Sequence, residues 1–295
     1  MKYSIVFPGQ GSQSLGMLSD LNSNFSVVSK VFQEASDSIS VDLWKILNED
    51  QEALNLTENT QPIMLAAGYA TFKVLSEETS LSPVSMAGHS LGEYTALVAS
   101  SSINLFDATR LVRKRGELMQ AAVPSGTGSM AAILGLEDSI VEKVCGEISG
   151  IVVPANYNCP GQLVISGEIN AIDLAIEKLT EKGARRALKL PVGGAFHSEL
   201  MKDAKDELSK AINETSFNSP ICPIYQNVNG RPEHLVDNIK RNLISQLTSP
   251  VKWTQSVNKM IEDGCQDFIE IGPGKVLQGL IKKINRDTNV SCPNL

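Results

Sequence analysis

A strand, a tight turn and a helix are encoded together in residues 83–99, PVSMAGHSLGEYTALVA. A short apolar run ends at Gly88, and a helix-compatible run begins at Leu91. Between them lies Gly88-x-Ser90-x-Gly92, the pattern of a nucleophile elbow, in which only glycine fits where a strand turns sharply into a helix. The pattern predicts that the Ser90 hydroxyl projects from a sheet beside backbone N–H groups at a helix start. Three fixed positions also arise by chance, so a serine nucleophile needs support from other residues.

The composition of the 295-residue chain is that of a globular protein, with 42% hydrophobic and 20% charged residues. This length suits one large domain or a domain that carries an insert. The formal charge of −7 argues against broad nucleic-acid binding. The first apolar run is too short for a signal peptide and no stretch could span a bilayer, so we expect no membrane association. Five scattered cysteines without a C-x-x-C pair predict neither disulfides nor a zinc site, and they favour a reducing compartment.

The first strand is predicted at residues 3–7, followed by a glycine-rich loop at 8–16. This loop lacks the lysine of a Walker motif and the third glycine of a dinucleotide fingerprint, so we interpret it as backbone that approaches a site, with the Gln10 amide at its apex. Helical patterns follow at 25–36, 41–48 and after Thr60, where Pro62 would lie in the first turn. Later elements are a strand at 221–228, a turn at Asn229-Gly230, a helix to 247, a helix opened by 249–253, a strand at 267–271, a helix to 284 and a polar, mobile tail beyond Arg286.

The helical pattern of residues 105–122 contains one charged residue on its apolar side. Arg115 falls on the apolar stripe one turn after Leu111. Because an unpaired buried charge is very costly, this arginine needs an anionic partner. One interpretation is a structural salt bridge to an internal carboxylate. The other is a bidentate clamp on a substrate carboxylate, which the planar guanidinium suits.

Residues 125–191 differ in pattern from the rest of the chain. After a linker-like break at 124–128, the pattern predicts strands at 129–135, 151–155, 162–166 and 184–190, and helices at 138–148 and 170–182. The order βαββαβ is that of a ferredoxin-like unit. We therefore expect an α/β protein with a discontinuous main domain, residues 1–124 and 192–295, and an inserted ferredoxin-like small domain, residues 125–191.

Only three histidines could act as a base for Ser90. His89 adjoins the serine, but successive residues at a tight turn point apart. His234 lies in a polar stretch and is expected at the surface. His197 lies in a loop at a predicted helix start, downstream of the serine, and by elimination it is the best candidate for the base.

Four stretches together resemble the malonyl-CoA:acyl carrier protein transacylases. They are residues 7–13 (FPGQGSQ), 88–94 (GHSLGEY), 194–198 (GAFHS) and 270–274 (EIGPG). Residues 115–120 and 156–162 also agree with the family, and the resemblance runs from residue 3 to about 285. It implies an α/β-hydrolase-like main domain. It also implies a ping-pong transfer of malonyl from malonyl-CoA to the phosphopantetheine thiol of holo acyl carrier protein, for fatty acid synthesis.

The resemblance assigns a role to individual residues. Ser90 would carry malonyl as an ester, and His197 would be the general base and later the general acid. The Gln10 and Leu91 backbone N–H groups would form the oxyanion hole, while Arg115 would grip the malonyl carboxylate.

The remaining roles concern the surroundings of these groups. The Gln246 backbone carbonyl would orient His197, and Phe196 would disfavour a methyl branch, since in related domains Ala-Phe-His goes with malonyl. Further positions matched to the CoA or phosphopantetheine arm are Asn156, Asn158 and Arg186. Gly193 departs from the family, where many relatives have serine, and it would loosen the loop before His197 slightly.

The resemblance also implies the partners and setting of the protein. No resident cofactor or metal is expected, since malonyl-CoA is a substrate and the phosphopantetheine belongs to the carrier. We expect a monomer in the cytoplasm, or in the plastid stroma of a photosynthetic eukaryote. The acidic carrier would dock on a local basic patch, although the same side chains suit ordinary solvated positions. Its candidate residues are Arg185, Arg186, Lys189, Lys275, Lys282 and Lys283.

Two other functions fit parts of the sequence. A serine esterase or thioesterase would use the same elbow, but the inward Arg115 and the absence of an obvious triad acid argue against it. A non-catalytic module that binds the carrier would not need Ser90, His197 and Arg115 intact.

Overall fold

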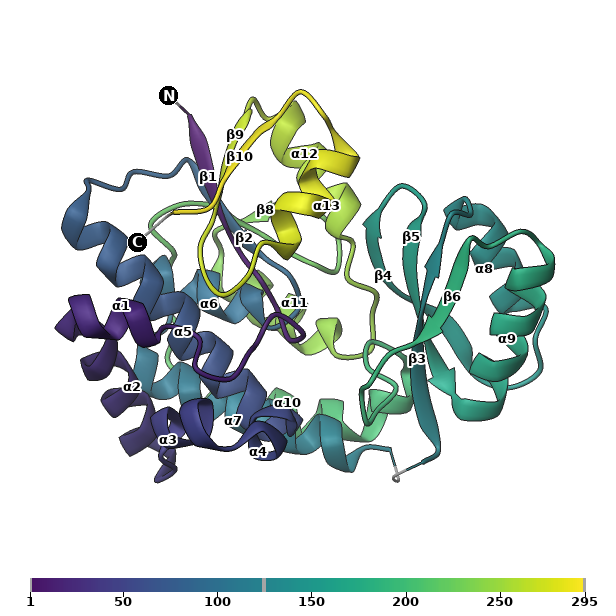
Figure 1. The fold of residues 1–295 in the computed structure, drawn as a ribbon, viewed down its shortest axis with the longest axis horizontal. Coiled ribbons are helices and arrows are strands. Elements are labelled where there is room, and N and C mark those ends of the chain that lie inside the picture. The colour runs from purple at the N-terminus through teal and green to yellow at the C-terminus, as the bar shows by residue number, and fades with distance from the viewer. Residues whose placement is uncertain (1, 124–125, 294–295) are drawn as a thin grey trace.

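Two β-sheets organise the chain, one in each of two parts that lie side by side (Figure 1). The computed structural model describes residues 2–123 and 126–293. The predicted domain boundary between residues 124 and 125 lies outside the described residues. Within them, no helix combines the length and apolar character that crossing a membrane requires.

The larger sheet has the strand order β10-β9-β1-β2-β7-β8. Its strands are β1 Tyr3–Phe7, β2 Ser85–Gly88, β7 Ile224–Tyr225, β8 Pro232–Glu233, β9 Asp267–Glu270 and β10 Asn289–Ser291. Neighbours from β10 to β7 are parallel, and β8 is antiparallel to β7. Phe7 lies opposite Gly88 at the ends of β1 and β2. The loops that follow these two strands therefore emerge together at one edge of the sheet, where open parallel sheets bind their ligands.

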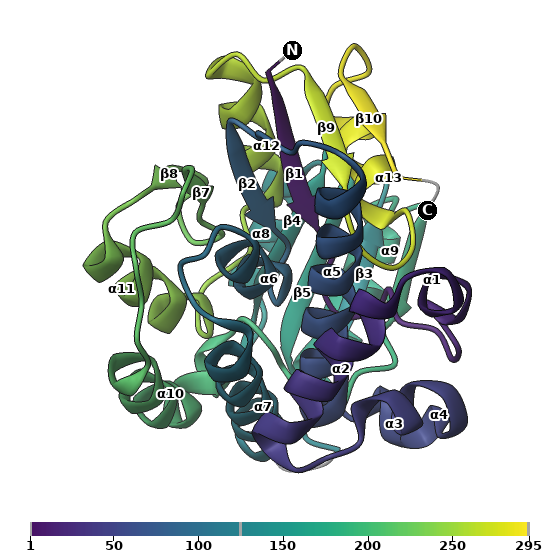
Figure 2. The same cartoon turned by 90° about the vertical axis from the view of Figure 1, so that its left-hand side faces the viewer.

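The residues of β1 alternate between two separate apolar cores. Ile5 and Phe7 face the larger core, and Val6 faces the opposite core. Both faces are thus buried, as is usual for parallel strands. Figure 2 shows α5 and α6 in front of β1 and β2. Helices of the larger core are α1 Ser19–Asn24, α2 Ser26–Ile39, α3 Leu43–Glu49, α4 Gln51–Asn55, α5 Thr57–Glu78, α6 Gly92–Ala99, α7 Leu105–Ala121, α10 Lys202–Glu214 and α11 Val236–Gln246; those of the opposite core are α12 Trp253–Glu262 and α13 Val276–Ile284.

The smaller sheet is antiparallel and has the order β4-β5-β3-β6. One face packs on two helices around a third apolar core (Figure 1). The other face contributes Met130 and Val164 to the larger core, where Phe196 is also buried. The elements of this part are β3 Gly128–Leu134, α8 Asp138–Gly146, β4 Val152–Cys159, β5 Gln162–Glu168, α9 Ile169–Glu181 and β6 Arg186–Lys189.

Backbone hydrogen bonds also join the two parts directly. The Val251 N–H donates to the Ala155 carbonyl at 2.8 Å, and the Tyr157 N–H donates to the Val251 carbonyl at 2.9 Å. Asn156 and Val251 form the resulting parallel bridge. The segment before α12 therefore extends the smaller sheet at β4, which fixes β4 next to the main part.

One predicted helix start is wrong. We expected the third helix to open after Thr60, but α5 begins at Thr57 and holds Pro62 inside it. Proline lacks the N–H that would bond the carbonyl four residues earlier, that of Glu58. The Arg113 guanidinium donates to this carbonyl at 3.3 Å instead, so a residue of α7 compensates the missing helical bond.

Three other predictions need correction. The strand expected at 221–228 is only Ile224–Tyr225, because the next residues bond elsewhere: the Gln226 N–H donates to the Arg231 carbonyl and the Asn227 N–H to Glu93. The tail beyond Arg286 is not a mobile end as far as it is described, since β10 pairs with β9. The helix expected from His197 starts later, as a 3-10 turn at Glu199–Met201 that leads into α10.

Candidate active site

The nucleophile elbow requires glycine at positions 88 and 92, because neighbouring backbone lies too close for a side chain. A Cβ on Gly88 would lie 1.8 Å from the Gly92 carbonyl carbon, and a Cβ on Gly92 would lie 2.1 Å from the Phe7 carbonyl oxygen. Ser90 itself has a φ of 51°, in the left-handed region that non-glycine residues seldom adopt. The turn between β2 and α6 therefore holds Ser90 in a strained conformation at the edge of the sheet, as functional sites often do.

Ser90 and His197 form a hydrogen-bonded pair. The Ser90 Oγ lies 2.8 Å from His197 Nε2, and His197 Nδ1 lies 2.8 Å from the backbone carbonyl oxygen of Gln246. A carbonyl can only accept, so Nδ1 carries the proton and Nε2 is left to accept the serine O–H. His197, like Ser90, has a positive φ, of 58°. Burial, together with the nearby Arg115 charge, lowers the pKa of His197 from 6.5 to about 3 and keeps the ring neutral.

Arg115 lies beside this pair with its guanidinium fully buried. It donates to Gln61 Oε1 at 2.8 Å, to Gln246 Oε1 at 3.0 Å and to Ser90 Oγ at 3.1 Å. Its charge also lies 5.4 Å from the centre of the Tyr94 ring. Among residues 2–123 and 126–293 no carboxylate forms an ion pair with Arg115. The structural salt bridge considered from the sequence is therefore not found there, and the charge faces neutral oxygens next to the serine.

The glycine-rich loop after β1 packs against the elbow. A Cβ on Gly9 would lie 2.4 Å from the His89 carbonyl oxygen, so the loop backbone touches the residue before Ser90. The next residue, Gln10, anchors its side chain on Thr57 at 3.4 Å. Leu91, the N-cap position of α6, is buried, and its N–H precedes the first helical hydrogen bonds. The loop after β1 thus touches the residue before Ser90, and the start of α6 follows directly after Ser90.

Sequence reasoning missed a group of polar residues beneath the elbow. Asn227 Oδ1 accepts from the Ser90 N–H at 2.7 Å, and its side-chain amide donates to the Gly88 carbonyl at 2.7 Å. Glu93 accepts from the Asn227 N–H at 2.8 Å and from the Gln246 side chain at 3.0 Å. The signal that could have revealed Glu93 is its position in α6, a short helix whose every residue is buried.

Known proteins match this chain over nearly its whole length. A family model described as "Acyl transferase domain" matches residues 4–292. The chain belongs to this acyl transferase family. The resemblance stated from the sequence is confirmed: the malonyl CoA-acyl carrier protein transacylase of Escherichia coli (strain K12) is 45% identical over 296 residues, covering 99% of this chain and 96% of the relative. The enzyme of the same name from Staphylococcus aureus (strain MRSA252) is 44% identical over 294 residues, covering 98% and 94%.

Solved structures agree with the family assignment. A malonyl-transacylase in complex with its type II PKS acyl-carrier protein superposes with a TM-score of 0.98 at 44% identity, covering all of this chain and 96% of that one. An acyl carrier protein S-malonyltransferase from Vibrio cholerae gives 0.96 at 46% identity, covering 100% and 97%. The acyl transferase is therefore a mixed α/β protein with one largely parallel sheet and a separate antiparallel sheet, like these relatives.

The other site residues predicted for the acyl transferase lie in different parts of the structure. Phe196 precedes His197 and is buried. Asn158, on β4, accepts a hydrogen bond from His89 Nε2 through its Oδ1 at 2.8 Å, so the His89 ring is engaged with Asn158 rather than with Ser90. Asn156 lies at the bridge between the two parts. Arg186 is exposed on the edge strand β6, and within the described residues no hydrogen bond joins it to Ser90 or His197.

Three of the predicted basic residues make separate contacts within the protein. Lys189 pairs with Asp173 at 2.5 Å, Lys282 donates to the Thr288 carbonyl, and Lys283 donates to Gln162 of β5 at 3.2 Å. Lys283 thereby joins α13 to the smaller sheet.

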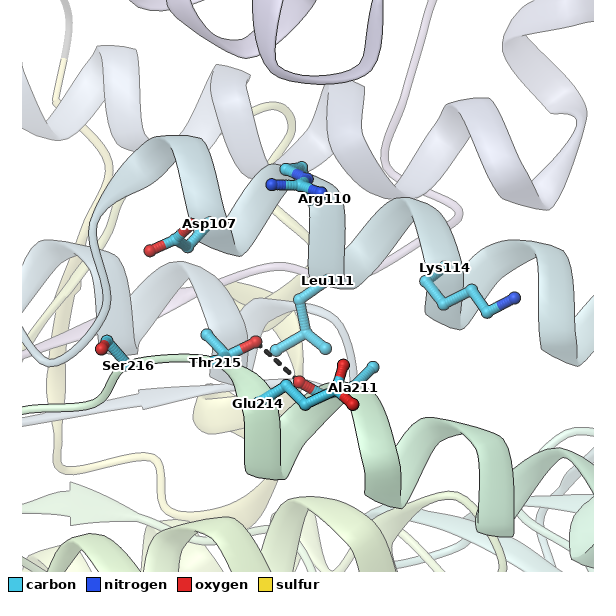
Figure 3. Close-up of a pocket in the computed structure, with 8 residues that line it drawn as sticks. All are labelled: Asp107, Arg110, Leu111, Lys114, Ala211, Glu214, Thr215 and Ser216. Carbon is cyan, nitrogen blue, oxygen red and sulfur yellow. Dashed lines mark hydrogen bonds between the residues drawn. The ribbon is translucent and has the colours of Figure 1, made fainter.

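One surface groove is lined by none of the residues of the elbow. Figure 3 shows this groove, of about 410 Å³, between α7 and α10. Asp107, Arg110 and Lys114 of α7 and Glu214 of α10 line it, so its charge is mixed. In the part of the chain that the structure describes, no group of three or more His, Cys, Asp or Glu side chains could hold a metal ion.

Proposed function

We propose that this acyl transferase moves the malonyl group from malonyl-CoA to the phosphopantetheine thiol of holo acyl carrier protein, through an ester on Ser90, and so supplies extender units for fatty acid synthesis. The observation that carries the proposal is the buried Arg115 charge, 3.1 Å from Ser90 Oγ and held by neutral oxygens. A site whose cation makes no direct ion pair and lies beside the nucleophile suits an acyl group that carries a carboxylate.

In the first half-reaction Ser90 attacks the malonyl thioester. The serine proton moves to His197 Nε2 as Oγ bonds to the carbonyl carbon. The negative charge that develops on the carbonyl oxygen is stabilised by the Gln10 and Leu91 N–H groups. The C–S bond then breaks, and the CoA sulfur leaves with the proton that His197 held. In the second half-reaction the carrier thiol gives its proton to His197 and attacks the ester, and Ser90 recovers the proton as it leaves.

The substrate carboxylate also makes His197 a stronger base. In the empty site the Arg115 charge contributes to the low pKa of His197, about 3, at which an imidazole is a weak base. A malonyl carboxylate on Arg115 would offset this charge and raise the pKa of His197 towards the operating pH. Acyl groups without a carboxylate would leave the base weak, so the same arginine selects the substrate and activates the dyad.

Other residues shape the site around the acyl group. We infer that Phe196 crowds the position of a methyl branch and favours malonyl, since its ring is buried directly before His197. A Cβ on Gly194 would lie 2.6 Å from this ring, so any larger residue at this position would clash with the ring. We also propose that the CoA or phosphopantetheine arm runs along β4 and β6, past Asn156, Asn158 and Arg186.

We further propose that the main part is α/β-hydrolase-like and the smaller part ferredoxin-like, with boundaries at residues 1–124, 125–191 and 192–295. The strand order β4-β5-β3-β6 and the sequence order β3-α8-β4-β5-α9-β6 support the second assignment. The elbow between β2 and α6 of a largely parallel sheet supports the first. The monomeric state and the cytoplasmic or plastid location stay predictions, and the proposed reaction needs no resident cofactor.

Two findings bear on the competing functions. His197 Nδ1 bonds to a backbone carbonyl rather than to a carboxylate, unlike the triads of most esterases. The Ser90–His197 hydrogen bond is intact, which a non-catalytic module would not require.

The proposal is tested by intact-protein mass after brief incubation with malonyl-CoA. We expect the wild type to gain the mass of one malonyl group and Ser90→Ala to gain none, while both proteins give the same unfolding temperature. A gain on both proteins, or on neither, would overturn the assignment of Ser90.

A further inference from the structure

We propose that Glu93 is a positioning residue of the acyl-transfer site, whose buried carboxylate holds Gln246 and Asn227 and through them sets His197, Arg115 and the Ser90 backbone. This inference rests on the proposed function, because it concerns how that site is kept in its reactive geometry.

The carboxylate accepts hydrogen bonds from two segments, the loop after β7 and the end of α11. Its Oε2 accepts from the Gln246 side-chain amide at 3.0 Å and from the Asn227 N–H at 2.8 Å. The Gln246 amide also donates to the Ser90 carbonyl at 3.2 Å, so one side chain spans from Glu93 to the elbow. Glu93 is 1% exposed, and the two hydrogen bonds that it accepts are buried.

An ionised carboxylate can accept hydrogen bonds but cannot donate them, and this fixes the direction of the Gln246 amide. The NH₂ group must point to Glu93, so Oε1 must point the other way, to Arg115 Nη2 at 3.0 Å. The backbone carbonyl of the same residue accepts from His197 Nδ1. Gln246 therefore holds both the base and the cation, and Glu93 determines which way its side chain faces.

Asn227 connects Glu93 to the backbone of the turn at Ser90. With its N–H bonded to Glu93, its Oδ1 accepts from the Ser90 N–H at 2.7 Å and its amide donates to the Gly88 carbonyl at 2.7 Å. These two bonds tie the strained turn at Ser90 to the end of β2. Loss of the Glu93 carboxylate would free Asn227 and loosen the turn that presents the nucleophile.

Protonation of Glu93 would remove the constraint, because a carboxylic acid can donate as well as accept. The charged and titratable groups around Glu93 are Arg115 from α7 and Tyr94 on its own helix; the loop after β7 and α11 present amides. Burial raises the pKa of Glu93 from 4.5 to about 7, against the opposing effects of its two hydrogen bonds and Arg115. The ionised Glu93 carboxylate, which holds Gln246 and Asn227 in place, is thus lost as the pH falls below about 7.

The test is the second-order rate of Ser90 loading at malonyl-CoA far below saturation, which reports the titration of the free enzyme, measured from about pH 5 to about pH 9 by quenched-flow and intact mass. We expect the wild-type rate to rise with pH through an apparent pKa near 7, a limb that His197 cannot supply because its pKa lies near 3. In Glu93→Gln the rate above this pKa should fall by about 10- to 100-fold, the cost of a misplaced base and nucleophile, and the limb should disappear.

Glu270→Gln is the matched control. Glu270 is also a buried glutamate with a raised pKa, and it accepts two backbone N–H groups, at the start of α13 rather than beneath the elbow. This variant should keep the acid limb whatever its stability.

Three results would overturn the role of Glu93: a wild-type rate that is flat with pH, an acid limb that survives in Glu93→Gln, or a limb lost equally in Glu270→Gln. The first needs no variant, so the proposal stays testable even where Glu93→Gln does not fold. Failure of the wild type to load at any pH would instead refute the proposed function, which separates the two claims.

Discussion

Replacement of Arg115 by alanine should change which acyl group the enzyme accepts. The guanidinium donates to Ser90 Oγ, Gln61 and Gln246, and no carboxylate among the described residues pairs with it. A malonyl carboxylate would supply that missing partner. Acetyl-CoA has the same thioester but no carboxylate, so it gains nothing from the arginine.

The size of the effect follows from the burial of the site. Removing one partner of a buried, hydrogen-bonded charge pair costs about 2–5 kcal/mol. At about 1.4 kcal/mol for each factor of ten, Arg115→Ala should lower kcat/KM for malonyl-CoA by about 30- to 5,000-fold relative to acetyl-CoA. The variant also leaves the two glutamine side chains short of a donor, which lowers stability by about 1–3 kcal/mol. The malonyl-to-acetyl ratio cancels this loss because both substrates meet the same protein.

The assay is the initial rate of Ser90 loading with each acyl-CoA, followed by intact mass. Arg113→Ala is the control, because Arg113 lies two residues away on α7 but bonds to Glu58, Asn59 and Glu117 instead of the elbow. It should lower stability and leave the ratio unchanged. An unchanged ratio in Arg115→Ala would refute the claim that Arg115 binds the malonyl carboxylate.

Two further predictions concern the elbow and its base. Gly92→Ala should destabilise the protein by about 3 kcal/mol in urea unfolding, since its Cβ would lie 2.1 Å from the Phe7 carbonyl oxygen; a cost below about 1 kcal/mol would contradict the close packing of β1 on α6. The folded-state pKa of His197, about 3, lies below the ordinary 6.5, so between these values the unfolded chain binds a proton that the folded chain does not, and stability falls as the pH falls. From pH 6.5 towards pH 5, the free energy of unfolding should therefore fall less in His197→Gln than in the wild type. The difference should reach about 1 kcal/mol per pH unit, and an equal fall in both proteins would contradict a neutral, buried His197.

Features encoded by neighbouring residues could be predicted from the sequence. The strand β1, the turn around Ser90 and the inward side of α7 all follow from short-range spacing, and the structure places Arg115 on the buried face of its helix. The alternation of strands and helices in residues 128–189 was likewise readable, because each element buries one face against the same small core.

Contacts between distant segments could not be predicted in this way. Gln61 meets Arg115 across 54 residues and Gln246 meets Glu93 across 153 residues, and no periodicity encodes such pairs. The start of α5 was misjudged for a related reason. Pro62 lies inside the helix, and Arg113 of the distant helix α7 donates to the carbonyl that the proline leaves free.

The most direct test of the account is the fate of the malonyl ester once it is formed. Wild-type protein loaded with malonyl and freed of CoA should keep the ester when mixed with apo carrier protein. With holo carrier protein it should lose the ester within the same time, as an equal amount of malonyl appears on the carrier by intact mass. Loss of the ester to water at the same rate with either form of the carrier would contradict transfer and indicate a hydrolase.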